Sequence, residues 1–239
     1  MDRNSNGYTF MFAAIMVVVV GALLAFAATS LKSKQDENVK KEKMQNILAS
    51  VGVIVEREEA PNQFTSVIKE QLALKVDGSV DDSAKAFDID LKSELSKKVE
   101  EQRFPLYVAE QDGQKFYIVP LRGAGLWDAI WGYVALEEDL NTIKGTVFDH
   151  KGETPGLGAE ITQKWFQDRF IGEKIMDPSG EIVGVAVAKG NTSQAKDDNK
   201  VDAISGSTIT GNGVTAMIKE RLSNYKNYFA SKKKLALNN

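Results

Sequence analysis

At 239 residues, the chain has room for one ordinary domain with additions, or for two small domains. Hydrophobic residues make up 43% of it and charged residues 26%, as is typical of a globular protein. The net charge of −3 lacks the basic excess of a nucleic-acid-binding protein, so we expect no nucleic acid partner. The chain has no cysteine and one histidine, His150. Disulfides and thiolate metal sites are therefore excluded, and a multi-histidine metal centre or a Ser-His relay is disfavoured.

The N-terminal segment predicts a membrane anchor. Residues 4–31 carry no charge, and residues 10–28 are almost wholly apolar. As a helix, that apolar run spans roughly 28 Å, close to the thickness of a bilayer's hydrocarbon core. Ala25-Phe26-Ala27 resembles a signal-peptide cleavage site, but the apolar run is longer than a signal core. We therefore expect a retained transmembrane helix.

The charges around this span favour one orientation. Arg3 precedes it, whereas five lysines follow it: Lys32, Lys34, Lys40, Lys41 and Lys43. Lysine and arginine gather on the cytoplasmic side of membrane proteins. Taken alone, this rule places the large C-terminal part in the cytoplasm.

Apolar periodicity predicts the following elements. Residues 35–51 predict an amphipathic helix, a stalk that ends at Gly52. Residues 53–100 mix short apolar strands with charged helical pieces. We therefore divide the chain into an anchor (1–31), a helical stalk and accessory region (32–100) and a third domain (101–239).

The third domain is rich in predicted strands. A hairpin of residues 105–109 and 116–120 turns at Asp112-Gly113. The other predicted elements, in chain order, are strands at 131–136 and 142–148, a helix at 161–169, a strand at 181–188, a surface loop at 189–201 and a C-terminal helix whose apolar face contains Val214, Met217, Ile218, Leu222, Tyr225 and Phe229. Strands and helices do not alternate regularly. This favours an α+β fold, with a mixed or antiparallel sheet and flanking helices.

Two segments of small residues are candidates for ligand binding. Residues 153–158 read Glu-Thr-Pro-Gly-Leu-Gly, and residues 202–210 combine hydroxyl side chains with Gly206 just before the C-terminal helix. Hydroxyls at that position cap a helix or bind a phosphate at its positive end. Trp127 and Leu157 are candidate apolar walls for a flat ligand. The alternative is that both are core side chains.

Five motifs in order carry a resemblance that spans essentially the whole chain, the anchor and stalk included. They are Gly-Ala-Gly-Leu-Trp (123–127), Gly-Tyr-Val-Ala-Leu-Glu-Glu-Asp (132–139), Thr-Ile-Lys-Gly (142–145), His-Lys-Gly-Glu-Thr-Pro-Gly-Leu-Gly (150–158) and Asp-Ala-Ile-Ser-Gly-Ser-Thr (202–208). Together they resemble the C subunits of bacterial sodium-translocating NADH:quinone oxidoreductases. The G subunit of the related Rnf complex shares two of these motifs.

The resemblance implies a covalently attached FMN. Its phosphate would be esterified to Thr208, and the attachment motif would include Ser205, Gly206 and Ser207. Ser207 stands where the family pattern has alanine, and Thr210 remains a second candidate for the attachment.

The same resemblance assigns further residues. Trp127 and Leu157 would contact the flavin ring, with Thr154, Gly156 and Gly158 along the same pocket. Asp202 would serve recognition by a flavin transferase or by its metal, and Lys189 would approach the flavin or its phosphate. No catalytic residue and no metal site is expected.

The resemblance also implies partners and a location. The partners are other subunits of a membrane redox complex, the flavin transferase and membrane lipid. The location is the bacterial inner membrane, with the large domain in the periplasm, in conflict with the lysine count. The implied function is to relay electrons from NADH toward quinone in a sodium pump. Two alternatives remain open: an electron carrier like the Rnf G subunit, and a membrane-anchored assembly module without a redox cofactor.

Overall fold

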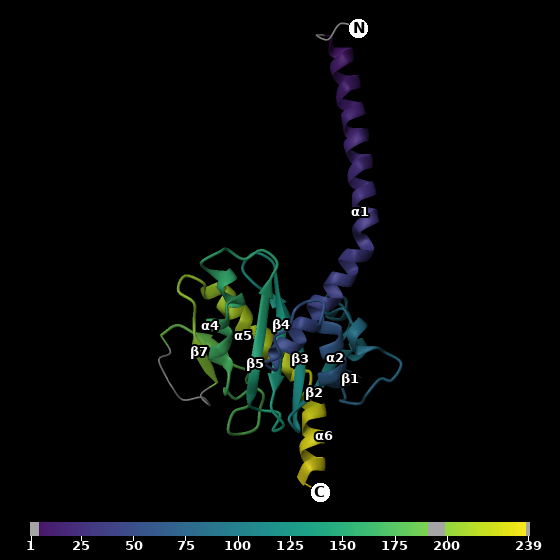
Figure 1. Ribbon diagram of the computed structural model, residues 1–239. Helices are drawn as coiled ribbons and strands as arrows, with labels where there is room; N and C mark the ends of the chain where they lie inside the picture. The colour runs from purple at the N-terminus through teal and green to yellow at the C-terminus, as the bar shows by residue number, and fades with distance from the viewer. Residues whose placement is uncertain (1–4, 191–198, 238–239) are drawn as a thin grey trace. The chain divides into compact units, whose positions relative to one another are not determined.

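The computed structural model describes residues 5–190 and 199–237 (Figure 1). The chain divides into two units, Met1–Lys43 and Met44–Asn239. Helix α1, Asn6–Ser50, runs through the first unit into the second. Among the described residues, α1 is the one helix long and apolar enough to cross a membrane. The predicted span and stalk are therefore continuous, and Gly52 follows the helix end with φ of +90° as predicted.

A five-stranded sheet forms the centre of the second unit. Its strands are β1 (Ile68–Leu74), β2 (Phe104–Gln111), β3 (Gln114–Ala124), β4 (Ala129–Leu136) and β5 (Ile143–His150). They pair in sequence order, and each pairing is antiparallel. Asp112 and Gly113 both have positive φ, as the tight turn of the predicted β2–β3 hairpin requires. Strand β1 comes from the predicted accessory region, and the division at residues 31 and 100 stays a prediction.

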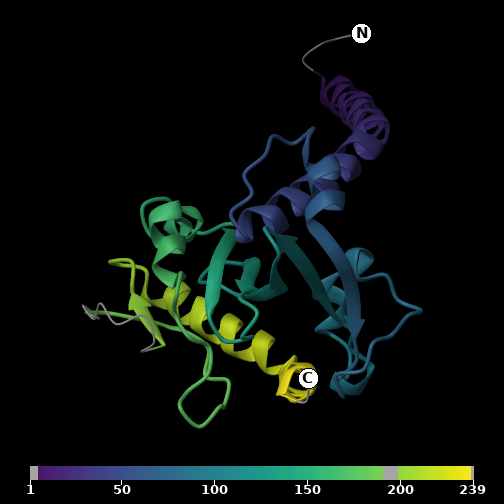
Figure 2. The same cartoon turned by 60° about the horizontal axis from the view of Figure 1, so that its bottom comes forward.

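Alternating side chains bury both faces of the sheet. Leu106, Val119 and Val134 belong to the cluster on one face, and Tyr107 and Ile118 belong to the cluster on the other. Helix α5 (Thr208–Ser223) covers the first face (Figure 2). Helix α2 (Ala60–Val67) and the end of α1 cover the second through Phe64, Val67, Ile47 and Leu48. The fold is thus the predicted α+β class with flanking helices.

The predicted helix at residues 161–169 is wrong. Three short pieces replace it: η3 (Gly158–Thr162), α4 (Lys164–Gln167) and η4 (Asp168–Phe170). Gln163 has extended backbone angles and interrupts the helix. The side-chain amide of Gln167 donates to the carbonyls of Ile161 and Thr162, which the interruption would otherwise leave unpaired.

The predicted strand at 181–188 is mostly irregular. Only β6, Ala186–Ala188, is a strand, because the chain turns at Gly184, where φ is +71°. A side chain at Gly184 would lie 3.0 Å from the backbone of Lys219 in α5. The predicted surface loop at 189–201 ends in β7 (Lys200–Asp202), which pairs parallel with β6, and residues 191–198 lie outside the described residues.

The predicted C-terminal helix is two helices. Helix α5 ends at Ser223, and α6, Lys226–Leu237, follows it. The predicted apolar face is nevertheless correct, because all six of its side chains are buried. The hydroxyl of Tyr225, between the two helices, donates to the carbonyl of Pro105 at 2.7 Å and ties this break to β2.

Candidate functional site

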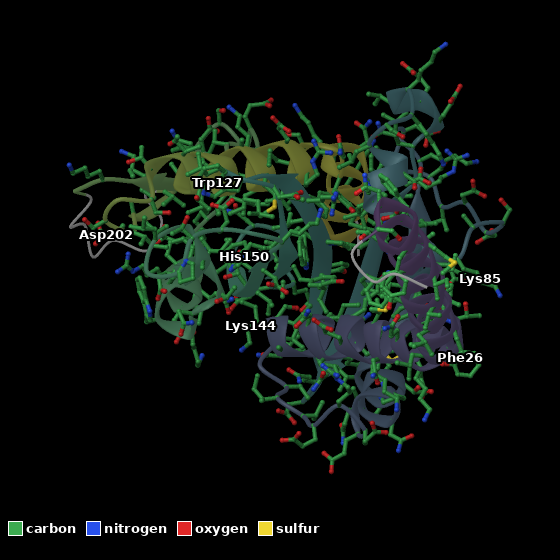
Figure 3. All side chains as sticks on the ribbon, turned by 90° about the horizontal axis from the view of Figure 1, so that it is seen from above. Phe26, Lys85, Trp127, Lys144, His150 and Asp202 are labelled. Atoms are coloured by element: carbon green, nitrogen blue, oxygen red, sulfur yellow. The ribbon has the colours of Figure 1, made fainter. Side chains whose placement is uncertain are left out.

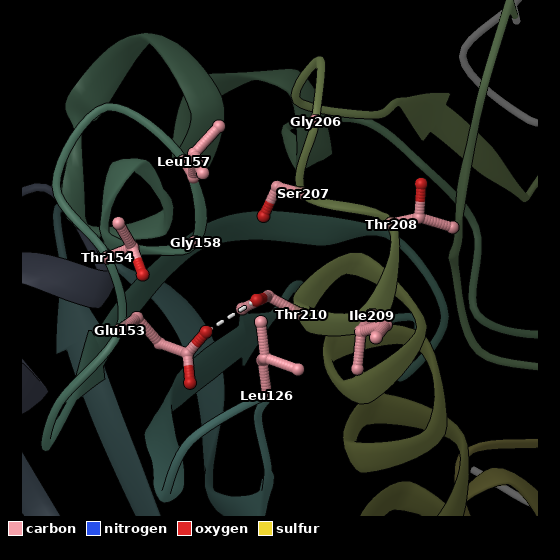
Figure 4. Close-up of a pocket in the computed structure, with 10 residues that line it drawn as sticks. All are labelled: Leu126, Glu153, Thr154, Leu157, Gly158, Gly206, Ser207, Thr208, Ile209 and Thr210. Carbon is pink, nitrogen blue, oxygen red and sulfur yellow. Dashed lines mark hydrogen bonds between the residues drawn. The ribbon is translucent and has the colours of Figure 1, made fainter.

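A cavity of about 220 Å³ opens where three segments meet (Figure 4). The segments are the turn between β3 and β4, residues 153–158 after β5, and the start of α5 with the loop before it. The residues that line the cavity are Leu126, Glu153, Thr154, Leu157, Gly158, Gly206, Ser207, Thr208, Ile209 and Thr210. Both segments of small residues singled out in the sequence thus line one cavity.

Missing side chains let α5 approach β3 closely. A Cβ on Gly213 would overlap the carbonyl oxygen of Ala124, and a Cβ on Gly123 would lie 2.8 Å from Cβ of Met217. Glycine at these two contacts removes the atoms that would hold helix and strand apart. The N-terminus of α5 therefore lies beside the β3–β4 turn, which carries Leu126 and Trp127.

Glu153 joins the three segments from below the cavity. Its Oε2 accepts from the hydroxyl of Thr210 at 2.5 Å, and its Oε1 accepts from the backbone N–H of Trp127 at 2.9 Å. The side chain is buried, with 4% exposed. Gly125 and Gly158 leave room for the carboxylate, because a Cβ on either would overlap one of its oxygens.

Hydrogen bonds keep this buried carboxylate charged. Burial alone raises the pKa of Glu153, but donors outweigh burial and lower the pKa below its ordinary value of 4.5. The donors are the Thr210 hydroxyl and the backbone N–H groups of Trp127, Leu126 and Asp128. A full negative charge therefore lies beneath the cavity at neutral pH.

The pKa shift of Glu153 predicts how stability depends on pH. A group whose pKa is lower in the folded state stabilises the fold above its unfolded pKa and loses that contribution as pH falls. In Glu153→Gln, an NH2 group replaces one of the two accepting oxygens and therefore faces a hydrogen-bond donor. We expect wild type to be more stable than this variant at neutral pH, with a difference that shrinks below about pH 4.5. Urea denaturation of both proteins between pH 3.5 and 7 measures it, and a pH-independent difference would contradict it.

The two predicted apolar walls are exposed. Trp127 has 69% of its surface exposed and Leu157 has 41%, so the alternative that they are core side chains is wrong. The indole N–H of Trp127 donates to the hydroxyl of Thr154 at 3.1 Å, which joins the β3–β4 turn to the 153–158 segment. The β4–β5 register pairs His150 with Ile130, three residues after Trp127 in the chain, and Figure 3 labels both His150 and Trp127. Nδ1 of His150 accepts from the backbone N–H of Glu153 at 3.1 Å.

The two candidate threonines differ in accessibility. Thr208 begins α5 and is exposed, and its side chain is turned away from Glu153 (Figure 4). Thr210 is 1% exposed, and its hydroxyl is engaged by Glu153. An enzyme acting from solvent reaches Thr208 and not Thr210.

The loop before α5 contains the other predicted hydroxyls. Ser205 and Gly206 are exposed, and Gly206 has φ of +76°. A Cβ on Gly206 would lie 2.8 Å from Cδ2 of Leu157. This glycine therefore lets the loop before α5 pack against that side chain. Ser207 is buried, and its Oγ has no hydrogen-bond partner within the described residues.

Five of the residues predicted for the site lie outside the cavity lining: Trp127, Gly156, Ser205, Asp202 and Lys189. Gly156 adopts φ of +75°, and its N–H donates to Oε1 of Glu160, so it shapes the turn before Leu157. Asp202 ends β7, where its carbonyl accepts from Arg169 at 2.6 Å. Lys189 is exposed and does not line the cavity.

Known proteins share this arrangement. A family model described as FMN-binding domain matches residues 125–223, which include the whole cavity lining. The C subunit of the Na(+)-translocating NADH-quinone reductase of Yersinia pestis is 32% identical, and the match covers 89% of this chain and 87% of that protein. The chain belongs to the family of these C subunits.

Solved structures of the family have the same fold. The crystal structure of the C subunit from Parabacteroides distasonis is 42% identical, with a TM-score of 0.76 over 83% of this chain and 96% of that chain. The crystal structure of NqrC from Shewanella oneidensis is 29% identical, with a TM-score of 0.72 over 82% of this chain and 98% of that chain. This C subunit is therefore one member of a multi-subunit translocase and has the other subunits as partners. Its FMN-binding domain makes it a flavin-bearing electron-transfer subunit, anchored by α1.

The residues of the cavity suit FMN. The exposed side chains of Leu126 and Leu157 lie on two separate segments and provide apolar walls for a flat ring, with the exposed Trp127 next to Leu126 on the β3–β4 turn. The positive end of α5, with no acidic residue in its first turn, suits a phosphate. The unpaired Ser207 hydroxyl is a polar group that a ligand can satisfy.

The sequence did not identify three members of the site. Leu126 and Ile209 line the cavity, and Glu153 anchors it. In the sequence, Glu153 stands out only as an acidic residue without a carboxylate partner for hydrolytic chemistry. The available signal was the pair of glycines at 125 and 158, since close backbone packing around a carboxylate requires small residues.

Proposed function

We propose that this protein carries FMN covalently, through a phosphoester to Oγ of Thr208, and relays electrons from NADH toward quinone. One observation carries the choice of residue: Thr208 is exposed at the start of α5, whereas Thr210 is buried and bonded to Glu153. When bound, the flavin supplies the electron-accepting and electron-donating group. The phosphoester would keep this group in place through repeated turnover.

The residues around Thr208 would hold and orient the nucleotide. Trp127 and Leu157 would contact the ring, with Thr154, Gly156 and Gly158 along one side. The bond between the Trp127 indole and Thr154 fixes that wall relative to the 153–158 segment. The first turn of α5, with Ser205, Gly206 and Ser207 before it, would face the phosphate. Electron relay requires no general base or nucleophile in this chain, and His150 serves a backbone hydrogen bond.

A separate flavin transferase would form the phosphoester. Oγ1 of Thr208 would lose its proton and bond to the flavin-bearing phosphorus of a flavin dinucleotide held by the transferase. The P–O bond of the diphosphate would break, and the other nucleotide would leave as a monophosphate that takes up the proton. Asp202 is partly exposed at the end of β7, six residues before Thr208, in a position for the transferase to recognise.

The experiment is expression of the full-length chain with and without a flavin transferase. We expect a band at the protein's size that fluoresces on a denaturing gel only when the transferase is present. A covalent bond survives denaturation, whereas bound flavin dissociates. A colourless protein from co-expression would overturn the proposal and favour an assembly module without a redox cofactor.

We also propose that the large unit faces the periplasm and that lipid surrounds the apolar part of α1. The lysines after the span argue for the opposite orientation, but an anchor inserted among partner helices need not follow a bias measured on short loops. Protease added to intact spheroplasts is expected to digest the large unit together with a periplasmic control protein. Protection of the large unit while that control is cut would show a cytoplasmic location.

A further inference from the structure

Ser207 carries a polar group that the protein itself leaves unpaired. The residue is 5% exposed, and its Oγ is buried without a hydrogen-bond partner among the described residues. Native proteins pair the large majority of buried side-chain polar atoms, because an unpaired one costs free energy. The exception lies in the cavity lining, directly before Thr208.

The helix start around Ser207 lacks its usual cap. Ser207 is the N-cap residue of α5, yet its hydroxyl does not bond to the first turn. A serine at this position normally accepts from a backbone N–H two or three residues later. The first helical hydrogen bond of α5 is donated by the N–H of Gly211 to the carbonyl of Ser207. The N–H groups of Thr208, Ile209 and Thr210 therefore remain as donors at the positive end of the helix.

The neighbouring negative charge does not compete for these donors. The carboxylate of Glu153 accepts from the Thr210 hydroxyl and from the Trp127 backbone N–H. No acidic residue lies in the first turn of α5. In Figure 4 the Ser207 hydroxyl points into the space between α5 and the 153–158 segment.

We infer that Ser207 is a further ligand-binding residue, whose hydroxyl donates to an oxygen of the phosphate that links the flavin to Thr208. The inference rests on the proposed attachment at Thr208. The hydroxyl precedes the esterified residue and can turn toward its phosphate by rotation about χ1. It joins the free N–H groups of the first turn as an anion-binding group. The loaded protein then pairs a hydroxyl that the unloaded protein leaves buried and unpaired.

The test compares wild type and Ser207→Ala, each as the full-length chain with and without attached flavin. Alanine removes one atom and adds none, so the variant should fold. We expect the unloaded variant to melt at the same temperature as unloaded wild type or higher. We expect the gain in Tm on loading to be smaller in the variant by about 2–6 °C, because the charge-assisted hydrogen bond is missing. The matched control is Ser223→Ala, which removes an exposed hydroxyl from the opposite end of α5 and should leave the gain unchanged.

Phosphorus NMR of the loaded proteins gives a second readout. We expect the phosphoester resonance to shift in Ser207→Ala and to stay in place in Ser223→Ala, since only the first substitution removes a donor to the phosphate. An equal gain in Tm and an unmoved resonance in loaded Ser207→Ala would overturn the inference and leave covalent attachment standing. Failure of wild type itself to retain flavin on a denaturing gel would instead overturn the proposed function.

Discussion

Thr208→Ala is expected to abolish covalent flavin: the fluorescent band on a denaturing gel should disappear, although the protein is made in normal amounts. Thr208 is exposed, and no side-chain hydrogen bond of its hydroxyl is found in the described part of the chain. Its loss should change the free energy of unfolding by less than about 0.5 kcal/mol. The substitution should thus abolish flavin attachment and leave the stability of the fold nearly unchanged.

Two other hydroxyls serve as controls. Ser223→Ala removes an exposed hydroxyl at the opposite end of α5 and should keep the band. Thr210→Ser keeps a hydroxyl for Glu153 and should also keep it, although the lost methyl lowers stability slightly. A band that survives in Thr208→Ala would move the attachment away from Thr208, with Thr210 as the first candidate.

Gly158→Ala is expected to disrupt the site through the buried carboxylate. The added Cβ would overlap Oε2 of Glu153 and lie 2.5 Å from Oγ1 of Thr210, so the hydrogen bond between these groups cannot persist. Overpacking and a weakened bond to a buried charge together cost about 2–4 kcal/mol. We expect urea denaturation to show this loss. We also expect a fainter fluorescent band, because Glu153 no longer holds the start of α5.

Gly152→Ala is the matched control. It lies in the same segment, but a Cβ there meets no atom within 4 Å, and its φ is not in the left-handed region. We expect stability and flavin loading close to wild type. If both variants lose the same free energy of unfolding, the effect of Gly158→Ala comes from the reduced conformational freedom of the backbone. The contact with the Glu153 carboxylate would then not be its cause.

The strongest sequence patterns predicted the fold well. Short apolar runs located β2 to β5, and Asp112-Gly113 specified the hairpin turn. The apolar face of the C-terminal region was correct because helical periodicity depends only on local spacing. The failures lie where tertiary contacts override that spacing. The extended backbone of Gln163 interrupts the predicted helix, and the side chain of Gln167 bonds to a carbonyl left free there. At Gly184 the backbone turns and passes close to α5, which ends the predicted strand.

The site was predicted by motif more than by physics. The family resemblance assigned the flavin-binding roles of Trp127, Leu157 and Thr208. All three side chains are exposed, as these roles require, but exposure alone is no test of flavin binding. No spacing rule brings residues 126, 153 and 207 together, because their proximity depends on the close contact between α5 and β3. The partner of Glu153 lies 57 residues away along the chain, which periodicity cannot reveal.

The strand order has a consequence for biogenesis. Each strand of the sheet pairs with its sequence neighbour, so the meander can assemble from its N-terminal end while synthesis continues. Helix α5 is among the last elements made, and its packing on β3 brings Thr208 against the β3–β4 turn. A truncated chain that ends before residue 208 would lack Thr208, the proposed acceptor. A chain that ends early in α5 would lack the part of that helix that packs on β3. Attachment at the proposed Thr208 would therefore come late in biogenesis, because that residue is made only after the whole five-stranded sheet.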